Sequence, residues 1–323
     1  MMPPLAYPLR FAPYYKTYLW GGDRLARYFG RSGLPAACGE SWELSAHPDG
    51  GGPLLNGPLA GATLADLARR FRRDLLGTRA PEPDRFPLLF KIIDAQANLS
   101  LQVHPTREAA RRLVSESKNE SWHLLETAPG ARLYAGLVPG TSPERLRAAL
   151  AAGTVEDLIV PHAAMAGGTI HIPAGLVHAI GAGCLLYEVQ QSANTTYRLH
   201  DWNRVDASGR LRPLHIEASL VSIDWSLPVP RVEPPRDIPD VWQTCSATAD
   251  FTLRRARLTR PQRLEPAGES FHVLFVAEGA GELQVGASCE TLAAGESLLV
   301  PACVAEYTFA PRASGATLLA TTL

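Results

Sequence analysis

The stretch LSLQVHP, Leu99–Pro105, decides the fold when it is taken together with HIPAGLVHAIG, His171–Gly181. In the first stretch polar and apolar residues alternate, and Gln102 and His104 fall on the polar side. A β-strand places successive side chains on opposite faces, so this strand has one polar and one apolar face. In the second stretch a run of residues that favour β-strands ends at a turn with proline and glycine, and His178 follows a few residues later. The pattern predicts short strands that carry possible metal ligands.

A third stretch, KNESW at Lys118–Trp122, lies between these two and contains Glu120. If this segment is also a strand, Lys118 lies on the same face as Glu120. The two imidazoles, the carboxylate and the amide oxygen of Gln102 form a ligand set that suits a borderline divalent metal such as zinc. The sequence therefore predicts a metal site inside a β-barrel.

Helical signals fall near 64–76 and 106–160, in a chain that otherwise has the pattern of strands and turns. Thr63, Thr106 and Ser142 stand at the expected starts of helices, and Ser142 is followed by proline and glutamate. This arrangement predicts a mostly β fold, an antiparallel barrel with a helical insertion, and argues against βαβ units.

The expected strands are short and bounded by turn residues. We expect the segment Leu5–Leu25 to be an irregular edge segment. The strands are predicted at Ser41–His47, Pro87–Asp94, Leu99–His104, Asn119–Leu125 and Ala131–Leu137, and again between Thr169 and about His200.

A proline-rich segment, Leu227–Pro239, is the best candidate for a linker between domains. Beyond it the sequence contains an internal repeat. GESLLVP at Gly295–Pro301 has the same spacing of glycine and proline as GGTIHIP at Gly167–Pro173. The second copy is followed by Glu306 where the first has His178. We therefore predict a metal-binding domain over 1–235 and a smaller related β-domain without metal over 236–323.

Composition excludes several classes of partner. The formal net charge is −1, so no global field favours nucleic acid or an anionic membrane. No apolar run approaches the roughly 20 residues that span a bilayer. The five cysteines are scattered and show no CxxC spacing, which is typical of reduced thiols in a cytoplasmic protein.

These motifs resemble the type I mannose-6-phosphate isomerases, a family of zinc-dependent cupin enzymes, in their shorter bacterial form. The resemblance covers essentially the whole chain, and its order and spacing make it specific. The motifs that carry it are WGGDRL, GESWELSAHPDG, FPLLFKIIDA, LSLQVHP, KNESW, IPAGLVHAIG and EVQQSANTTYRLHDWNR.

The resemblance implies a cupin-type jelly-roll barrel with a helical insertion, followed by a second, smaller cupin-like β-domain. It implies an enzyme that interconverts mannose 6-phosphate and fructose 6-phosphate. We expect a cytoplasmic protein that is a monomer or a homodimer, and the sequence leaves this choice open. The implied roles are zinc ligation by Gln102, His104, Glu120 and His178, catalysis by Arg198, Glu188 and Lys118, and substrate binding by Ser100 and Lys91.

This reaction moves a proton between C1 and C2 of the sugar through an enediol. The permanently charged guanidinium of Arg198 suits the developing enediolate. The proton-transferring group stays open between Glu188, a lysine and a histidine. Structural roles also stay open, namely an ion pair of Arg198 with Asp201, a surface charge at Lys91 and a salt bridge at Glu188.

Two other functions are compatible with the same residues. Two histidines and one carboxylate also form the site of iron-dependent cupin oxygenases, although there the acid usually lies close in sequence to the first histidine. A non-catalytic sugar-phosphate binder could use the same cavity. Metal content, dependence on O₂ and turnover separate these alternatives.

Overall fold

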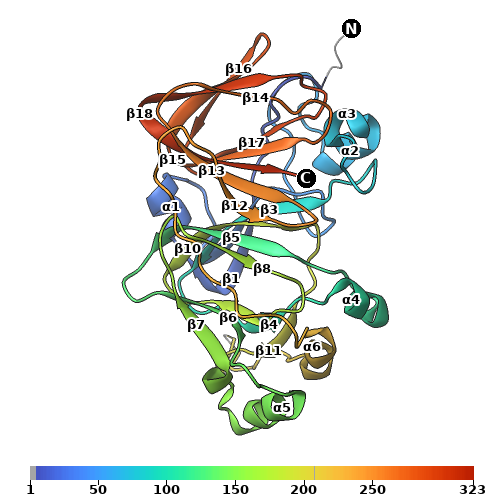
Figure 1. Ribbon diagram of the computed structural model, residues 1–323, viewed down its shortest axis with the longest axis vertical. Helices are drawn as coiled ribbons and strands as arrows, with labels where there is room; N and C mark the ends of the chain where they lie inside the picture. Colours follow the sequence, from blue (N-terminus) through green and yellow to red (C-terminus); the bar gives the residue numbers. More distant parts are fainter. Residues whose placement is uncertain (1–4, 207) are drawn as a thin grey trace. The chain divides into compact units, whose positions relative to one another are not determined.

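The computed structural model describes residues 5–206 and 208–323 and contains three β-sheets (Figure 1). Contacts between residues divide the chain into two compact units. One unit contains Tyr15–Glu40 and Ile92–Pro234, and the other contains Met1–Tyr14, Ser41–Lys91 and Pro235–Leu323. One division falls between Pro234 and Pro235, one residue before the predicted boundary, whereas 41–91 groups with the C-terminal segment. The division into a metal-binding and a metal-free domain stays a prediction.

Two sheets carry the strands in which the sequence places the metal ligands. The six-stranded sheet has the order β1 (Tyr14–Gly22), β2 (Cys38–Leu44), β3 (Leu88–Ala95), β10 (Cys184–Gln191), β5 (Glu120–Thr127) and β8 (Thr169–Ile172). The five-stranded sheet has the order β11 (Tyr197–His200), β4 (Leu101–Val103), β9 (His178–Ile180), β6 (Arg132–Leu137) and β7 (Ile159–Ala163).

An apolar cluster joins these two sheets. Trp122 and Leu186 from the first sheet pack in the same buried cluster as Leu133 and Ile180 from the second. Burial of such side chains stabilises each by about 1.5–3 kcal/mol relative to exposure. The sheets therefore face one another across a common core, as the predicted barrel requires.

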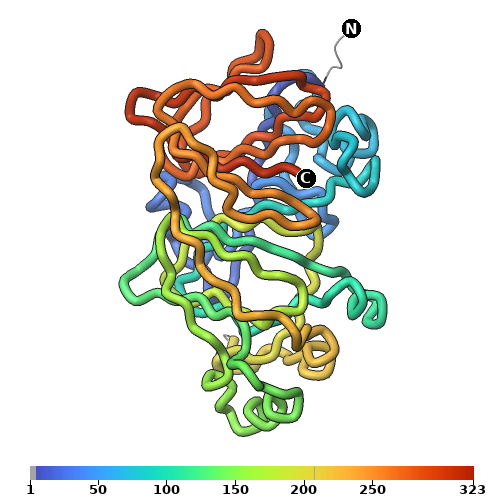
Figure 2. The backbone as a smooth tube through the Cα atoms, in the orientation of Figure 1, coloured from blue at the N-terminus to red at the C-terminus, as the bar shows by residue number. Residues whose placement is uncertain are grey.

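The C-terminal segment forms the third sheet, traced from orange to red in Figure 2. Its order is β12 (Gln243–Ala247), β13 (Thr252–Leu258), β18 (Tyr307–Thr322), β15 (His272–Val285) and β16 (Ser288–Ala293), with β14 (Gln262–Leu264) on β18 and β17 (Ser297–Val300) on β15. The long strand β15 shifts register next to Gly279, whose φ of 76° and closeness to the Gly315 carbonyl oxygen exclude a side chain.

The helices α2 (Leu64–Phe71), α4 (Arg107–Leu113) and α5 (Pro143–Ala152) begin at the predicted N-caps. The Thr63, Thr106 and Ser142 hydroxyls accept hydrogen bonds from backbone N–H groups three residues later, at 3.1, 3.1 and 3.2 Å. The short 3₁₀ helix η1 (Val155–Leu158) follows α5. The predicted starts of these three helices are confirmed.

Three expectations about the elements are wrong. The segment Leu5–Leu25 contains the regular strand β1, because Gly21 and Gly22 permit close approach to neighbouring backbone and to Asp94 rather than ending the strand. The predicted helix 64–76 is broken at Arg72, where φ is 49°, and continues as α3 (Arg73–Leu76). Helices α1 (Arg24–Phe29) and α6 (Ile216–Ser222) lie outside the two predicted helical regions.

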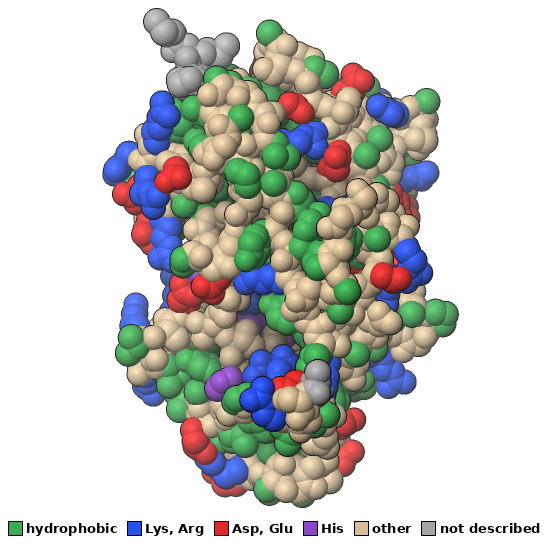
Figure 3. Space-filling model, turned by 180° about the vertical axis from the view of Figure 1, so that it is seen from behind, with side chains coloured by type: hydrophobic (Ala, Val, Ile, Leu, Met, Phe, Trp, Pro, Cys, Tyr) green, Lys and Arg blue, Asp and Glu red, His purple; other side chains and the backbone are tan. Residues whose placement is uncertain are grey.

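The surface agrees with the weak net charge. Basic and acidic side chains are interspersed on the face that Figure 3 presents, so no large field of one sign forms there. Within residues 5–206 and 208–323, no helix combines the length and the apolar character that crossing a bilayer requires.

A buried histidine in the C-terminal sheet predicts a pH dependence of stability. Burial, together with the positive charge of Arg254, lowers the pKa of His272 from its ordinary value of 6.5 to about 4. Between these pH values the unfolded chain binds a proton that the folded chain does not, so stability falls as the pH falls through this window. The difference corresponds to roughly 3 kcal/mol.

We expect His272→Gln to remove this part of the pH dependence, as measured by urea unfolding at pH 7 and at pH 4.5. Other titrating groups are present in both proteins and cancel in the comparison. His162→Gln is the matched control, because His162 is only half-buried and its Nε2 donates one hydrogen bond to the Ala135 carbonyl oxygen. Equal slopes in His272→Gln and the unmodified protein would refute the assignment.

Candidate metal centre

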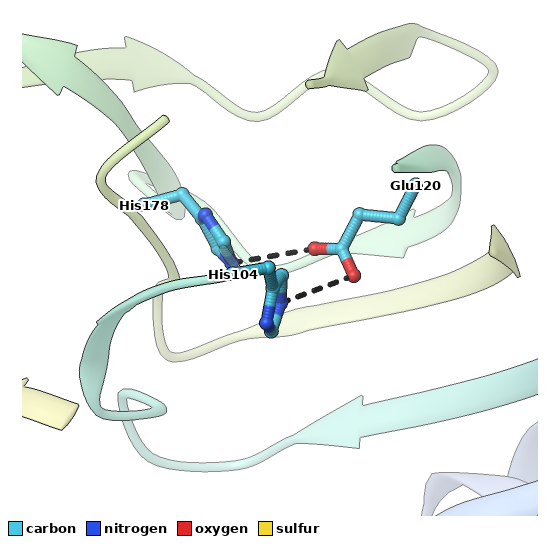
Figure 4. A group of neighbouring side chains, drawn as sticks. All are labelled: His104, Glu120 and His178. Carbon is cyan, nitrogen blue, oxygen red and sulfur yellow. Dashed lines mark ion pairs between the residues drawn. The ribbon is translucent and has the colours of Figure 1, made fainter. Parts of the chain in front are cut away.

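Three buried side chains from different strands point toward one another in Figure 4. His104 follows β4, Glu120 begins β5 and His178 begins β9. Their ligand atoms all lie within 4.8 Å of one another. His104 Nε2 is 3.4 Å from Glu120 Oε2, and His178 Nε2 is 3.3 Å from Glu120 Oε1. The structure therefore brings together three of the four predicted ligands as one group.

Hydrogen bonds to the backbone fix the tautomer of both histidines. Nδ1 of His104 is 2.8 Å from the Thr195 carbonyl oxygen, and Nδ1 of His178 is 2.8 Å from the Leu176 carbonyl oxygen. A carbonyl oxygen only accepts, so each Nδ1 donates its proton and each Nε2 keeps a lone pair. Both lone pairs are directed to the side of Glu120, the arrangement that metal-ligating histidines require.

The electrostatics keep all three groups in the protonation state that binds a metal ion. Burial and the nearby Lys118 ammonium lower the pKa of His104 to about 3. Burial also lowers the pKa of His178. Burial opposes ionisation of Glu120, but Lys118 and the two imidazoles hold its pKa well below the usual range. At neutral pH the centre thus holds two neutral imidazoles and one carboxylate.

The polar atoms that face one another at this centre fit a cation. Nε2 of His104 and Oε1 of Glu120 are buried and have no hydrogen-bond partner among the described residues. Buried polar atoms without a partner cost about 1–3 kcal/mol each, and more when they are charged. His104 Nε2 and the Glu120 carboxylate are both acceptors, and neither carries a proton that the other could accept. A metal ion bound between them would satisfy both. The donor set, two nitrogens and a carboxylate, matches zinc.

Gln102 lies beside this group, directly opposite His178 in the β4–β9 pairing. Its Nε2 is 3.3 Å from His178 Nε2, and its Oε1 accepts a hydrogen bond from the Ser100 hydroxyl at 3.3 Å. Rotation of the amide group about its last bond exchanges these two atoms and presents Oε1 to the centre. Gln102 and Ser100 are thus placed at the centre, and the role of Gln102 as a ligand stays a prediction.

Lys118 is the buried cation of the centre. Its Nζ lies 2.7 Å from Glu120 Oε2 and donates a hydrogen bond to Gln190 Oε1 at 3.1 Å. Gln190 is opposite Glu120 in the β10–β5 pairing, so its side chain lies on the same face of the sheet. The structure therefore places Lys118 against the predicted metal ligands.

Glu188 lies on the same face, two residues before Gln190 and opposite Trp122. Its Oε2 accepts a hydrogen bond from the Trp122 indole N–H at 2.9 Å. The Trp122 ring in turn lies edge-on to the His178 ring, with centroids 5.5 Å apart. Trp122 therefore joins this carboxylate to the metal centre.

Arg198 is opposite Gln102 in the β11–β4 pairing, so both side chains lie on one face. Its Nη1 donates to the Pro213 carbonyl oxygen at 2.9 Å, whereas its buried Nε has no hydrogen-bond partner among the described residues. Burial and the charge of Arg212 lower the pKa of Arg198. Asp201, the alternative structural partner, forms its ion pairs with Arg204 and Arg212.

Lys91 lies in β3, in the compact unit that contains Ser41–Lys91. It is buried, and its ammonium lies 5.2 Å from the centre of the Trp42 ring. Its interpretation as a surface charge is therefore wrong. Its role in substrate binding stays a prediction.

Sequence reasoning missed the groups that hold the ligands in place. The carbonyl oxygens of Thr195 and Leu176 orient the two histidines, and backbone groups leave no signature in the sequence. Gln190 could have been found from the sequence. It lies two residues after Glu188 in β10, so the two side chains lie on the same face of the strand.

Known phosphomannose isomerases are similar to this chain in sequence. The family model for the catalytic domain of type I phosphomannose isomerase matches residues 9–123. The mannose-6-phosphate isomerase ManA of Bacillus subtilis (strain 168) is 34% identical, over 93% of this chain and 95% of that protein.

Solved structures confirm the predicted mostly β, cupin-type fold. The crystal structure of the mannose 6-phosphate isomerase from Bacillus subtilis has a TM-score of 0.87 at 28% identity, covering 98% of this chain and 100% of that one. A zinc-bound mannose 6-phosphate isomerase has a TM-score of 0.74 at 16% identity, with 98% of this chain and 99% of that one covered. At the latter identity the likeness shows the fold alone.

Proposed function

The chain belongs to the family of type I mannose-6-phosphate isomerases, and on this premise we propose that it interconverts mannose 6-phosphate and fructose 6-phosphate at the centre of His104, Glu120 and His178. One divalent metal ion, zinc, is the cofactor. The observation that carries the proposal is this buried group, whose two imidazoles and carboxylate are held ready for a cation. The donor set of two imidazoles and one carboxylate supports the choice of zinc.

The residues that would hold the metal are His104 and His178 through Nε2, Glu120 through its carboxylate and Gln102 through its amide oxygen. A bound zinc ion supplies Lewis-acid chemistry, which polarises a carbonyl or hydroxyl oxygen and is worth several kcal/mol in the transition state. With one carboxylate and neutral partners, the ligand set leaves the centre net positive. The adjacent Lys118 ammonium adds to this positive potential.

The proton transfer falls to side chains around the centre. In the forward direction a base removes the proton from C2 of the open-chain aldose, which gives an enediolate with the negative charge on O1. The proton of the O2 hydroxyl passes to O1, and C1 receives a proton as the C2 carbonyl forms, which gives the ketose. Glu188 and Lys118 are the candidates for this transfer, because each is buried on the face that carries Glu120. We propose both for this transfer.

Arg198 supplies the charge that the enediolate needs. Its side chain shares a face with Gln102, and its Nε has a hydrogen to donate that no described residue accepts. A guanidinium donates two parallel hydrogen bonds to an anion and stays charged throughout. Arg198 therefore suits stabilisation of the negative oxygen, and Ser100 and Lys91 stay proposed contacts to the substrate.

The test is a coupled assay that follows fructose 6-phosphate formed from mannose 6-phosphate. Turnover without consumption of O₂ is the expected result. Binding of mannose 6-phosphate without turnover would support the non-catalytic binder instead. Iron content with O₂ consumption would support the oxygenase. We also propose that the protein is cytoplasmic, because its five cysteines are scattered in the way that is typical of reduced thiols.

Removal of the metal is expected to abolish isomerisation. Dialysis against a chelator should reduce the activity to background, because the oxygen of the substrate then loses its Lewis acid. Addition of one equivalent of zinc per chain should restore the activity, as measured by the coupled assay with metal analysis. Full activity in chelated protein that contains no metal would contradict the proposal.

A further inference from the structure

The C-terminal sheet carries an open pocket that the isomerase reaction does not use. The cavity measures about 610 Å³, a size that accommodates a small metabolite. It lies within the unit that contains Pro235–Leu323. Threonine hydroxyls, an amide and three arginines make its wall polar, and the residues used below are Trp242, Thr244, Thr252, Arg254, Gln262 and His272.

His272 occupies the place in this sheet that Glu120 has in the metal centre. In the first copy of the internal repeat, Ile172 precedes Pro173 and is opposite Glu120 in the strand pairing. In the second copy, Val300 precedes the proline and is opposite His272. His272 Nδ1 is hydrogen-bonded to the Tyr307 hydroxyl at 2.8 Å, and both groups are buried. The position that carries a metal ligand in one copy thus carries a neutral polar pair in the other.

Arg254 gives the cavity a positive charge that the protein does not neutralise. The other two arginines of the wall have counter-ions, since Arg79 pairs with Glu269 and Arg263 lies 3.4 Å from Glu265. Arg254 is half-buried, and no described residue forms an ion pair or a side-chain hydrogen bond with it. Its guanidinium lies over the Trp242 ring, 5.3 Å from the ring centre.

We propose that this cavity is a second, metal-free ligand site that binds a phosphorylated polyol or sugar through Arg254. The planar guanidinium matches two oxygens of a phosphate group, and its stacking on Trp242 orients it in advance. Thr244, Thr252 and Gln262 offer hydroxyl and amide groups for the hydroxyls of the ligand. The low pKa of His272, about 4, keeps this neighbour neutral at pH 7, so it adds a hydrogen bond without a competing charge.

The site stands independently of the isomerase centre, and the experiment separates the two. Glucose 6-phosphate is titrated by calorimetry into the zinc-loaded protein and into Arg254→Met. We expect one class of sites to weaken at least about tenfold in Arg254→Met, since a charge-assisted hydrogen-bond pair is lost. Competitive inhibition of the isomerase by glucose 6-phosphate should be the same in both proteins, because the isomerase centre is not changed. The kcat for mannose 6-phosphate should be unchanged in Arg254→Met, which also shows that this variant is folded.

Matched variants keep the test decisive. Arg257→Met removes an exposed arginine from the same strand, and should bind glucose 6-phosphate as the unmodified protein does. If Arg254→Met fails to fold, Arg254→Lys retains the charge without the planar fork and should still weaken binding several-fold. Trp242→Phe should remove the change of tryptophan fluorescence that accompanies binding.

Several outcomes would overturn the proposal. Unchanged affinity and stoichiometry in folded Arg254→Met would show that the cavity does not bind the phosphate ester. The same holds if all glucose 6-phosphate that binds to the unmodified protein is displaced by a competitive inhibitor of the isomerase. Equal affinities for inorganic phosphate and glucose 6-phosphate would remove the part of the proposal that assigns a polyol.

Discussion

Replacing His178 by alanine is expected to remove the bound metal and the isomerase activity together. His178 contributes an Nε2 lone pair whose direction is fixed by the hydrogen bond from Nδ1 to the Leu176 carbonyl oxygen. Loss of outer groups that only orient a metal ligand typically costs 10–100-fold in affinity or activity. Loss of the ligand itself should exceed this, and we expect kcat/KM to fall by about 10³-fold or more.

The measurement combines metal analysis with the coupled assay on one preparation. His162→Ala is the matched control, since His162 lies in the same compact unit and only bonds to a backbone carbonyl. We expect this control to keep one metal ion per chain and nearly full activity. An active His178→Ala protein that contains no metal would refute the assignment of the centre.

Replacing Arg198 by alanine is the second large effect. The metal should be retained, because Arg198 is not among the three grouped ligands. The kcat should fall by about 10²-fold or more, as expected when one group that stabilises a developing oxyanion is removed. Arg198→Lys should recover part of this loss, because it restores the charge but not the planar fork.

A split between kcat and KM distinguishes a catalytic from a structural Arg198. Arg204→Gln removes a neighbouring guanidinium that Asp201 holds in an ion pair at 2.8 Å, so we expect a smaller effect from it. Near-normal kcat in Arg198→Ala would move Arg198 to a structural role. A change confined to KM would instead indicate substrate binding.

Much of the site could be predicted because its ligands lie on short strands with an alternating pattern. Gln102 and His104 are two residues apart, which places both side chains on one face of an extended segment. The meeting of His104 with Glu120 and His178 could not be deduced from alternation alone. It depends on strand pairings such as Gln102 with His178, which join segments far apart in the sequence.

Each wrong prediction about the fold has a physical reason. The apolar positions Leu64, Leu67, Ala68 and Leu75 follow one helical face, so nothing in the pattern reveals the break at Arg72. The glycines of β1 suggest an irregular segment, although they serve close contacts that only the folded chain shows. The grouping of residues 41–91 with the C-terminal segment is likewise a property of long-range contacts.

The same limit applies to charge. The sequence places Asp201 close to Arg198 and leaves an ion pair between them open, whereas the folded chain brings Arg212 to Asp201 across a loop. Because Asp201 pairs with Arg212 instead of Arg198, the Nε of Arg198 has no hydrogen-bond partner among the described residues. Such competition between arginines cannot be decided without coordinates.

A crystal structure of the zinc-loaded protein, with anomalous diffraction recorded on both sides of the zinc absorption edge, tests the metal centre most directly. We predict a single strong anomalous peak, about 2.0–2.1 Å from Nε2 of His104 and of His178 and within bonding distance of the Glu120 carboxylate. The absence of a peak there in crystals of active protein, or a peak only at other side chains, would contradict the assignment.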